Sequence, residues 1–410
     1  MGTICNSPTH PVILSKRKLQ ILIFAVNFKK TASFLHLWLG LLSGLVVLIS
    51  LTAASVFVWQ EELTNWYYHD AVYVKAVGGE KKPVSELLNA ARLVVKGGPV
   101  GYVSISNEPR KAYVFSAYKE SAVKGWTFDS RSEYEYKIYV DEYTGKVTGL
   151  VDTRYDWINC MYIIHVCLYL NYDYGHYIIG GATLIIFVMA LTGIILWWPK
   201  NKPAFKQRIW FRWKKTTKWR RKNYDLHNIG GIYTWIFILF FAATGLVWTF
   251  DWWTNGIYRL LGDDPAKLFV EAPTPRQDIG KTPDIYEHLL RDGAARISNW
   301  QNIQLVFLDH QTDSSQMVSS IVRYNTGSGW DEWDEYTYNS KSGKMYHKFT
   351  QSQKRLGEKW RTSNYAIHTG SIYGLPTKIL ATFISLFCAF LPVSGFLIWF
   401  GRKKKATRAR

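Results

Sequence analysis

Four long apolar stretches without a charged side chain constrain this 410-residue chain more than any other feature. They extend from about Leu35 to Trp59, Tyr177 to Trp198, Ile229 to Phe250 and Ile379 to Phe400. A bilayer core of about 30 Å needs roughly 20 helical residues at 1.5 Å per residue. Each stretch is long enough, so the sequence predicts four membrane-spanning helices and a membrane protein in contact with lipid.

Clusters of basic residues predict how these helices are oriented. Residues 199–222 hold eleven Lys or Arg and no acid, and the tail after Gly401 holds six more bases. Residues 61–157 are nearly balanced, with fourteen acids and thirteen bases. Basic loops stay in the cytoplasm, so both termini and the 199–224 loop are predicted to be cytoplasmic. Every basic cluster adjoins an apolar stretch, so we expect no nucleic-acid partner.

Short sequence patterns recur in the two halves of the chain. His36 follows Leu35 and has Gly40 four residues later, and His227 follows Leu226 and has Gly231 four residues later. The second stretch ends Leu-Thr-Gly-Ile-Ile-Leu-Trp, and the fourth ends Val-Ser-Gly-Phe-Leu-Ile-Trp. Both halves enter and leave the membrane in the same sense, which indicates a parallel internal duplication about an axis along the membrane normal.

The two polar segments between spans also match each other. Each begins with a predicted amphipathic helix, Val84 to Lys96 or Pro283 to Ile297, and continues with alternating strand-like runs. Each ends in a hairpin whose turn contains Gly145 or Gly343, where positive φ is expected. The predicted strands are Gly101–Ser106, Ala112–Tyr118, Gln304–Leu308 and Met317–Tyr324, with hairpins at Tyr136–Val151 and Glu335–His347.

The predicted fold is therefore a membrane α-helical four-helix bundle with two extracytoplasmic α+β modules, produced by the duplication. The predicted segments are a cytoplasmic N-terminal segment (1–30, irregular), the first span (31–60), outer module 1 (61–155), an outer helix and the second span (156–198), a basic cytoplasmic loop (199–224), the third span (225–250), outer module 2 (251–360), an outer approach and the fourth span (361–401) and a basic cytoplasmic tail (402–410).

Four histidines occupy matching places in the repeats. His36 and His227 begin the first and third spans, and His165 and His368 precede the second and fourth. If the halves pack about an axis, His36 faces His227 at one depth and His165 faces His368 at another. Two facing imidazoles can ligate the iron of a flat macrocycle from both sides. Gly40 and Gly231, one turn further along, would let a porphyrin lie against the backbone.

Plainer interpretations of the same residues stay open. A single histidine at a helix end is usually an interfacial polar group, and small residues in a membrane helix usually mark helix packing. His176 is an alternative to His165, although it has no counterpart in the second half. A two-metal centre or proton relay is disfavoured because the spans hold no acids. His69, His288, His310 and His347 lie in polar segments and are predicted to be solvated or locally hydrogen-bonded.

The order and spacing of these motifs resemble the PepSY-associated transmembrane proteins, which include iron-regulated siderophore reductases of the bacterial cytoplasmic membrane. The resemblance implies two b-type haems held by His36, His165, His227 and His368, and electron delivery to ferric siderophores outside. The second hairpin of this chain departs from the PepSY pattern, because Asn339-Ser340-Lys341-Ser342 stands in place of the acidic turn. The motifs that carry it are Phe34–Gly40, Ile164-His165, Gly175–Gly180, Asp225–His227 with Gly231, Ile367–Gly370, Tyr373–Pro376 and the turns at Val140–Val147 and Tyr338–Met345.

The expected function is therefore transmembrane electron transfer to a ferric siderophore or similar iron chelate. The chain has no GxGxxG fingerprint in a βαβ setting, so a separate donor, a quinol or a cytoplasmic reductase, is expected to supply the electrons. Two other functions stay open: a non-enzymatic membrane-anchored PepSY sensor that modulates a peptidase, and an iron-chelate transporter. A haem spectrum distinguishes the electron carrier from both.

Overall fold

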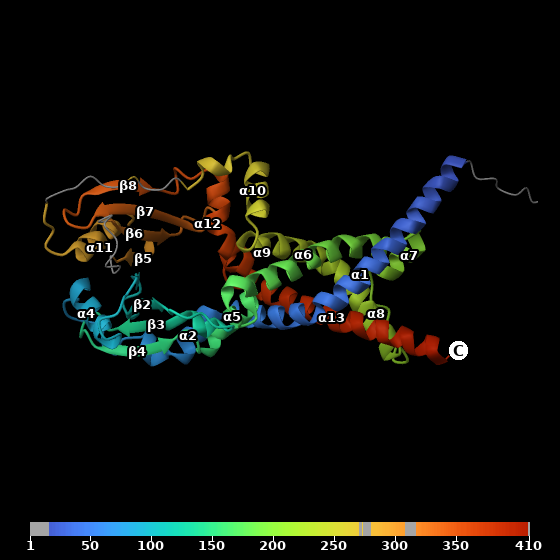
Figure 1. The fold of residues 1–410 in the computed structure, drawn as a ribbon, viewed down its shortest axis with the longest axis horizontal. Helices are drawn as coiled ribbons and strands as arrows, with labels where there is room; N and C mark the ends of the chain where they lie inside the picture. The colour runs from blue at the N-terminus through green and yellow to red at the C-terminus, as the bar shows by residue number, and fades with distance from the viewer. Residues whose placement is uncertain (1–15, 270–272, 274–279, 308–316, 409–410) are drawn as a thin grey trace, which may run out of the picture. The chain divides into compact units, whose positions relative to one another are not determined.

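The computed structural model describes residues 16–269, 273, 280–307 and 317–408. The chain divides into two compact units, each described by itself below. The first unit comprises the described parts of 1–45, 185–236 and 391–410, and the second comprises those of 46–184 and 237–390. Each of the four long helical segments contributes residues to both units (Figure 1).

Four helical segments of the described chain are long and apolar enough to cross a membrane, as predicted. Their apolar spans cover Phe28–Phe57, Tyr172–Trp197, Trp219–Trp248 and Leu375–Arg402. They belong to α1 (Lys16–Phe57), to α6 (Tyr172–Trp197), to the run of α8 (Trp219–Asp225), η2 (Leu226–Gly230), α9 (Gly231–Gly245) and η3 (Leu246–Trp248), and to α13 (Leu375–Arg408).

Two of these helices begin earlier than predicted. The prediction that residues 1–30 are irregular is wrong for residues 16–30, because α1 begins at Lys16, while residues 1–15 lie outside the described chain. Residues 16–30 contain neither Gly nor Pro, so nothing in them interrupts a helix. The third helix likewise begins at Trp219 rather than at residue 225.

In the first unit the four helices form a closed bundle, because each contacts the next around a ring. Polar contacts join α1 to α6, α6 to α9 and the α9 segment to α13, and a close approach of small residues joins α13 to α1. The contacts are His36 Nδ1 with Thr192 Oγ1 at 3.1 Å, Trp235 Nε1 with Ala190 O at 3.0 Å, His227 Nδ1 with Ser394 Oγ at 2.8 Å, and Gly44 against Pro392.

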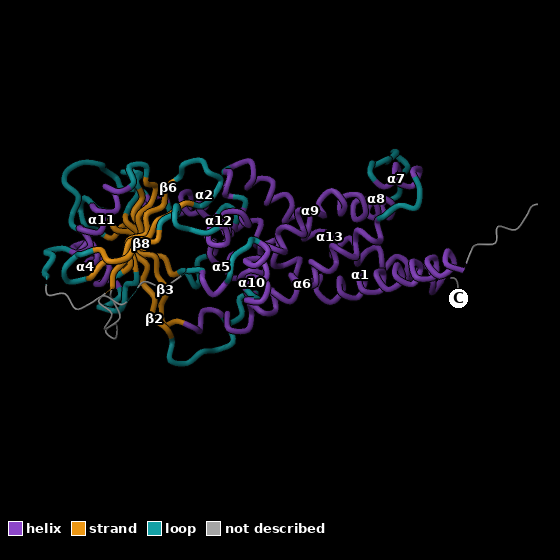
Figure 2. Tube along the Cα trace, turned by 90° about the horizontal axis from the view of Figure 1, so that it is seen from above, coloured by secondary structure: helices purple, strands orange, loops and turns teal. Residues whose placement is uncertain are grey.

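The second unit contains one antiparallel sheet, whose strands are orange in Figure 2. It has eight strands in the order β4-β3-β2-β1-β5-β6-β7-β8. From the central β1–β5 pair outward, the strands follow in chain order on both sides, β1 to β4 on one side and β5 to β8 on the other. The strands are β1 (Tyr102–Ser106), β2 (Tyr113–Glu120), β3 (Ser132–Val140), β4 (Val147–Asp152), β5 (Trp300–Val306), β6 (Met317–Tyr324), β7 (Glu332–Asn339) and β8 (Met345–Phe349).

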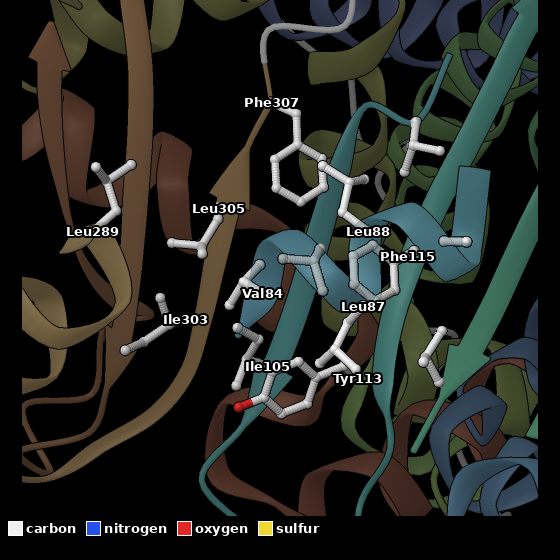
Figure 3. Close-up of a cluster of buried hydrophobic side chains, with 14 of the residues drawn as sticks. Val84, Leu87, Leu88, Ile105, Tyr113, Phe115, Leu289, Ile303, Leu305 and Phe307 are labelled. Carbon is white, nitrogen blue, oxygen red and sulfur yellow. The ribbon is translucent and has the colours of Figure 1, made fainter. Parts of the chain in front are cut away.

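The pairing of β1 with β5 joins the strands of both predicted α+β segments into one sheet. The two strands run antiparallel, with Ile105 opposite Ile303. Helices α4 (Val84–Val94) and α11 (Ile285–Arg296) contact each other, and their apolar residues share one hydrophobic core with the strands of both halves (Figure 3). The local sequence pattern predicts each strand, but it does not predict which edges of two similar sheets will pair.

Both predicted hairpins are confirmed. Gly145 has φ 72° and Gly343 has φ 69°, the left-handed conformation that a residue with a Cβ adopts at a cost. Each turn is also capped in the same way by the side chain that opens it. The Asp141 carboxylate accepts the backbone N–H groups of Tyr143 and Thr144, and the Asn339 amide oxygen accepts those of Lys341 and Ser342.

Shorter helices lie in the segments between the long helices and the strands, and α7 lies in the loop between α6 and α8. Two of them matter for the site: α5 (Trp157–Cys167) carries His165, and α12 (Leu356–Thr369) carries His368. The others are α2 (Gln60–Tyr67), α3 (His69–Val72), α7 (Lys202–Arg208) and α10 (Asp251–Leu260), with short 3₁₀ turns η1 (Phe128–Arg131), η4 (Pro265–Lys267) and η5 (Ser371–Tyr373).

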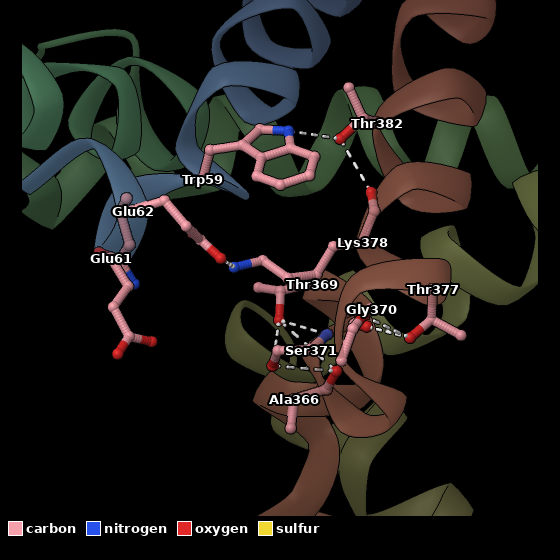
Figure 4. Close-up of polar contacts among 12 residues, drawn as sticks. Trp59, Glu61, Glu62, Ala366, Thr369, Gly370, Ser371, Thr377, Lys378 and Thr382 are labelled. Carbon is pink, nitrogen blue, oxygen red and sulfur yellow. Dashed lines mark hydrogen bonds and ion pairs between the residues drawn. The ribbon is translucent and has the colours of Figure 1, made fainter. Parts of the chain in front are cut away.

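A polar cluster joins α1 and α2 to the start of α13 (Figure 4). The buried Lys378 ammonium lies 2.6 and 2.7 Å from the two oxygens of the half-exposed Glu62 carboxylate. The Trp59 indole N–H donates to Thr382 Oγ1 at 2.9 Å. These contacts hold the end of α1 against α13 within the second unit.

Glu62→Gln is expected to lower the stability of the second unit by about 1 kcal/mol, because the buried Lys378 charge loses its carboxylate while Glu62 itself is partly screened by water. The thermal midpoint of the purified protein measures this. Glu61→Gln is the matched control, since the Glu61 carboxylate is exposed and lies 3.9 Å from Lys111. Equal midpoints for the two variants would show that the Glu62–Lys378 pair contributes nothing.

Candidate cofactor site: two pairs of histidines

The structure brings together both histidine pairs that the sequence placed opposite each other. In the first unit, the ring centres of His36 and His227 lie 6.3 Å apart, with their planes at 90°. In the second unit, the ring centres of His165 and His368 lie 6.2 Å apart, with their planes at 27°. Each pair joins helices from different halves of the chain.

A hydroxyl group from a neighbouring helix binds Nδ1 of all four rings. The four pairs have the same chemistry, although the helices that supply them differ. The distances are 3.1 Å for His36 and Thr192, 2.8 Å for His227 and Ser394, 2.9 Å for His165 and Ser50, and 2.8 Å for His368 and Thr244.

These hydroxyls determine which ring nitrogen carries the proton. Each has one hydrogen, and each donates it to a backbone carbonyl, as Thr244 does to Phe240 O at 2.9 Å. Its oxygen must therefore accept the Nδ1–H of the imidazole. His165 supports this assignment independently, because its Nδ1 also lies 3.2 Å from the carbonyl oxygen of Ser50, which can only accept. The other hydroxyls donate to Met189 O, Leu391 O and His165 O.

The Nε2 atom of each ring then carries a lone pair. None of the hydrogen bonds among the described residues reaches Nε2 of these four rings. Two neutral imidazoles that face each other in this protonation state offer two electron-pair donors and no proton to share. This donor set fits an electron-pair acceptor, such as a metal ion, between the rings.

The spacing of the rings fits the same interpretation. A metal–imidazole bond is about 2.0 Å long, and the centre of a five-membered ring with bonds of about 1.35 Å lies about 1.15 Å from each ring atom. Two imidazoles on opposite sides of one metal ion therefore have centres about 6.3 Å apart. A direct N–H···N hydrogen bond of about 2.9 Å would bring the centres to about 5.2 Å. The observed 6.2 and 6.3 Å match the metal-bound spacing.

Glycines beside three of the hydroxyls make room for the rings. A Cβ added at Gly193, Gly245 or Gly395 would lie 3.3–3.4 Å from Cε1 of the histidine that the adjacent hydroxyl binds. That spacing is tighter than an ordinary van der Waals contact, so alanine at these positions would press on the ring. In each of these Ser/Thr-Gly pairs, the hydroxyl contacts the ring at Nδ1 and the glycine lies beside Cε1. The pairs at Gly193, Gly245 and Gly395 hold His36, His368 and His227, respectively, in this way.

The two glycines predicted to admit a porphyrin differ from each other. A Cβ at Gly231 would meet no atom within 4 Å, which leaves open space beside His227. A Cβ at Gly40 would lie 2.8 Å from Cε of Met189, so Gly40 accommodates a close helix–helix contact. A role for Gly231 at the face of a macrocycle stays a prediction, whereas Gly40 has a packing explanation of its own.

Two buried asparagines extend the sites in the second half of the chain. Asn223 and Asn364 each precede a site histidine by four residues, one helical turn. Asn223 Nδ2 donates to Ser394 O and Asn364 Nδ2 donates to Thr244 O, both at 3.0 Å. The Oδ1 atoms of both asparagines are buried without a hydrogen-bond partner. Buried polar atoms normally have a partner, so the shared vacancy indicates a missing donor beside each site.

The surroundings of the second pair keep its imidazoles neutral. Burial lowers the pKa of His165, and it lowers the pKa of His368 to about 3. The rings of Phe241 and Trp248 lie against His368, with centres 5.8 and 5.2 Å from it. Neutral imidazole is the form that binds metal, so these apolar surroundings favour ligation over protonation at pH 7.

The alternative ligand His176 lies elsewhere in the second unit. Its Nδ1 contacts the carbonyl oxygen of Tyr172 in its own helix, and its ring packs on Tyr172 and Tyr177. No other histidine ring packs on it in the described chain. Of the polar-segment histidines, His288 Nε2 binds Gly343 O at 3.0 Å and His69 pairs with Asp70, as expected for local contacts. His310 lies outside the described residues.

Each pair offers two protein ligands and no more. Among the described residues, no group of three or more His, Cys, Asp or Glu side chains is arranged to hold a metal ion. A metal held by two opposed imidazoles therefore needs further ligands from a non-protein group. A porphyrin could supply these ligands, with His36 and His227 holding one iron and His165 and His368 the other.

Sequence analysis missed the residues that orient the histidines. Ser50, Thr192, Thr244, Ser394, Asn223 and Asn364 contact the rings or their hydroxyl partners. The signal was present: each of the four spans contains a Ser/Thr-Gly pair, three of which lie beside a site histidine, and two of the four histidines follow an asparagine by one turn. The pairs in the second and fourth spans were used only as evidence of the repeat. The sequence does not show which way their side chains point from the helix. The π-turn η2 that contains His227 was also missed.

The comparisons with known proteins agree with the four spans. The family model described as the PepSY-associated TM region matches residues 34–402. This range includes the first apolar span from residue 34 onward, the other three spans in full, the eight-stranded sheet and both histidine pairs. None of the curated proteins matches the chain.

Proposed function

The chain belongs to the family of PepSY-associated transmembrane regions, and from this premise we propose that it is a haem-containing transmembrane electron carrier. It would take electrons from a separate donor, a quinol or a cytoplasmic reductase. It would reduce ferric siderophores or similar iron chelates on the outer side of a bacterial cytoplasmic membrane, for iron uptake.

One observation carries this proposal: two pairs of facing imidazoles, each with Nδ1 bound to a hydroxyl and with ring centres 6.2 or 6.3 Å apart. No hydrogen bond among the described residues reaches Nε2 of these four rings, so the Nε2 atoms are available as ligands.

The residues of this chain would bind the cofactor and hold it rigidly. His36 and His227 would supply Nε2 ligands at one site, and His165 and His368 at the other. The hydroxyls fix each ring against rotation, and the apolar rings of Phe241 and Trp248 exclude water from the second pair. Iron held by two imidazoles and a porphyrin supplies a one-electron couple. A site built on rigid helices changes little when the charge on the metal changes.

The proposal includes a topology and an origin for the fold. The basic clusters support a topology with both termini and the 199–224 loop in the cytoplasm and with the sheet outside. The strand order reads the same from the centre outward, and the two hairpins are capped alike, which supports an internal parallel duplication with two PepSY-like modules. In this arrangement the joined modules form the surface at which an iron chelate is reduced.

A reoxidation experiment tests the function. The protein is purified after haem-replete expression, reduced with dithionite under argon, freed of reductant and mixed with a ferric hydroxamate or catecholate chelate. We expect the ferrous haem bands to decay as a ferrous-specific dye reports an equal amount of iron released. The apo-chelator without iron is the control.

The outcomes separate the competing functions. A colourless protein after haem-replete expression would contradict the electron carrier and favour the peptidase-modulating sensor or the chelate transporter. A haem protein that stays reduced in the presence of every ferric chelate would retain the cofactor assignment but reject the substrate.

Thr244→Val is expected to weaken haem retention at the His165–His368 site by roughly 10–100-fold. Valine keeps the shape of threonine but leaves the Nδ1–H of His368 without an acceptor. The remaining haem should have a higher reduction potential, because the imidazole donates less electron density to ferric iron. Redox titration measures this shift, which simple unfolding would not produce. Thr244→Ser keeps the hydroxyl and should behave as wild type; equal potentials in both variants would refute the role of the hydroxyl.

A further inference from the structure

The segment from Trp198 to Lys222, the basic–aromatic loop, joins the second and third spans. Its residues 199–222 carry eleven Lys or Arg and no acid, and it also contains five tryptophan or phenylalanine residues after Trp198. The loop lies in the first unit with the helix ends that it connects. The exposed aromatic side chains are Trp198, Phe205, Trp210, Phe211, Trp213 and Trp219.

The loop is folded back on the helices rather than extended. The Trp197 indole N–H donates to Arg208 O at 3.4 Å, and Arg208 Nη1 donates to Leu196 O at 3.3 Å at the end of α6. The Tyr233 hydroxyl of α9 donates to Ile209 O. Helix α7 is capped by Asn201, which accepts from the backbone N–H of Ala204 at 2.9 Å. The loop therefore has a defined position beside the ends of two spans.

The far end of the loop is fixed to the helix that carries His227. The buried Asp225 carboxylate accepts the Trp213 indole N–H at 3.2 Å and pairs with Arg221 Nε at 3.0 Å. Asp225 is the first acid after the eleven bases, and this one carboxylate cannot balance them. The loop thus retains a large positive charge that the described chain does not neutralise.

From this surface we infer that the basic–aromatic loop is a binding site for anionic phospholipid headgroups. Exposed tryptophan rings suit the boundary between headgroups and acyl chains, and Lys and Arg side chains bind lipid phosphates. Because the loop starts at the last residues of α6 and contacts α9, its exposed residues lie at the membrane surface wherever the spans cross it. The inference is independent of the haem proposal.

The aromatic residues favour lipid over an acidic protein as the occupant. Attraction to an acidic protein needs only the charges, and it would leave Trp210 and Trp219 exposed to water between encounters. Each Lys or Arg near an anionic membrane surface adds to the attraction between them. Eleven such side chains beside two spans would keep acidic lipids in the first lipid shell permanently.

Lipid retention by the full-length protein tests the inference. The protein is reconstituted in nanodiscs with equal amounts of phosphatidylglycerol and phosphatidylcholine, transferred to mild detergent, and its bound lipids are counted by native mass spectrometry. We expect several-fold more phosphatidylglycerol than phosphatidylcholine on the wild type. A variant with Lys202, Lys206, Lys214 and Lys215 each changed to Gln should approach parity.

A matched control removes the same charge from the second unit, through Lys75, Lys146, Lys344 and Lys348 each changed to Gln. This control should keep the wild-type lipid ratio. Trp210→Ser with Trp219→Ser offers a second test that leaves every charge in place, and it should lower total lipid retention. Parity in the wild type, or an unchanged ratio in the loop charge variant, would overturn the inference and leave an acidic protein partner as the alternative.

Discussion

His368→Ala is expected to lower the haem content of the purified protein from two haems per chain to one. The imidazole of His368 faces His165 with ring centres 6.2 Å apart, and its removal would leave the iron with a single protein ligand in an apolar site. The other pair uses different residues of the first unit, so its haem should remain. Pyridine haemochrome absorbance per chain measures the loss, and His165→Ala should give the same result.

His176→Ala is the matched control for this experiment. His176 lies near the same span but binds the Tyr172 carbonyl and no other histidine, so its removal should leave both haems in place. If His176→Ala lost a haem and His165→Ala did not, the ligand assignment at this site would be wrong. If His368→Ala kept both haems, the paired geometry would have no part in binding them.

Phe115→Ala is expected to destabilise the second unit by about 3–5 kcal/mol, because it removes a fully buried ring from the core that both halves share. The ring stacks on Phe307 with centres 6.1 Å apart and planes at 19°. Urea-dependent pulse proteolysis of the sheet measures the loss. Val123→Ala, at an exposed loop position, should change stability by less than about 0.5 kcal/mol.

A double-mutant cycle between Phe115 and Phe307 tests whether the halves share one core. Phe115 lies in β2 and Phe307 follows β5, so they come from opposite halves of the chain. Direct stacking predicts a coupling energy of about 0.5–1.5 kcal/mol. Additive losses from Phe115→Ala and Phe307→Ala would mean that the two halves of the sheet are stabilised independently.

Sequence pattern predicted the elements of this fold better than their assembly. Uninterrupted apolar length predicted the four spans, and alternation with a Gly turn predicted the hairpins at Gly145 and Gly343. The β1–β5 pair could not be predicted, because its register depends on two distant edges with similar alternation. The early start of α1 at Lys16 was missed because a basic segment was taken as irregular, although nothing in it interrupts a helix.

At the candidate site, the duplication predicted which histidines face each other but not what orients them. His165 was chosen over His176 because His165 matches His368 in the repeat and His176 matches no histidine in the second half. The structure places His165 against His368. The hydroxyl of Thr244 is hidden in an apolar span, where threonine commonly bonds its own helix backbone. Its contact with His368 depends on helix rotation, which sequence periodicity does not fix in a helix that is apolar on all sides.

Electron paramagnetic resonance of the oxidised, purified protein tests the paired-imidazole account most directly. Ring planes near 90° at His36–His227 would leave the two d orbitals of a bound iron that overlap with the ligands nearly equal in energy. Planes at 27° at His165–His368 would split the energies of those orbitals. The account predicts two low-spin ferric signals of equal intensity, one highly anisotropic and one rhombic. A protein without haem, or a single high-spin ferric signal, would contradict it.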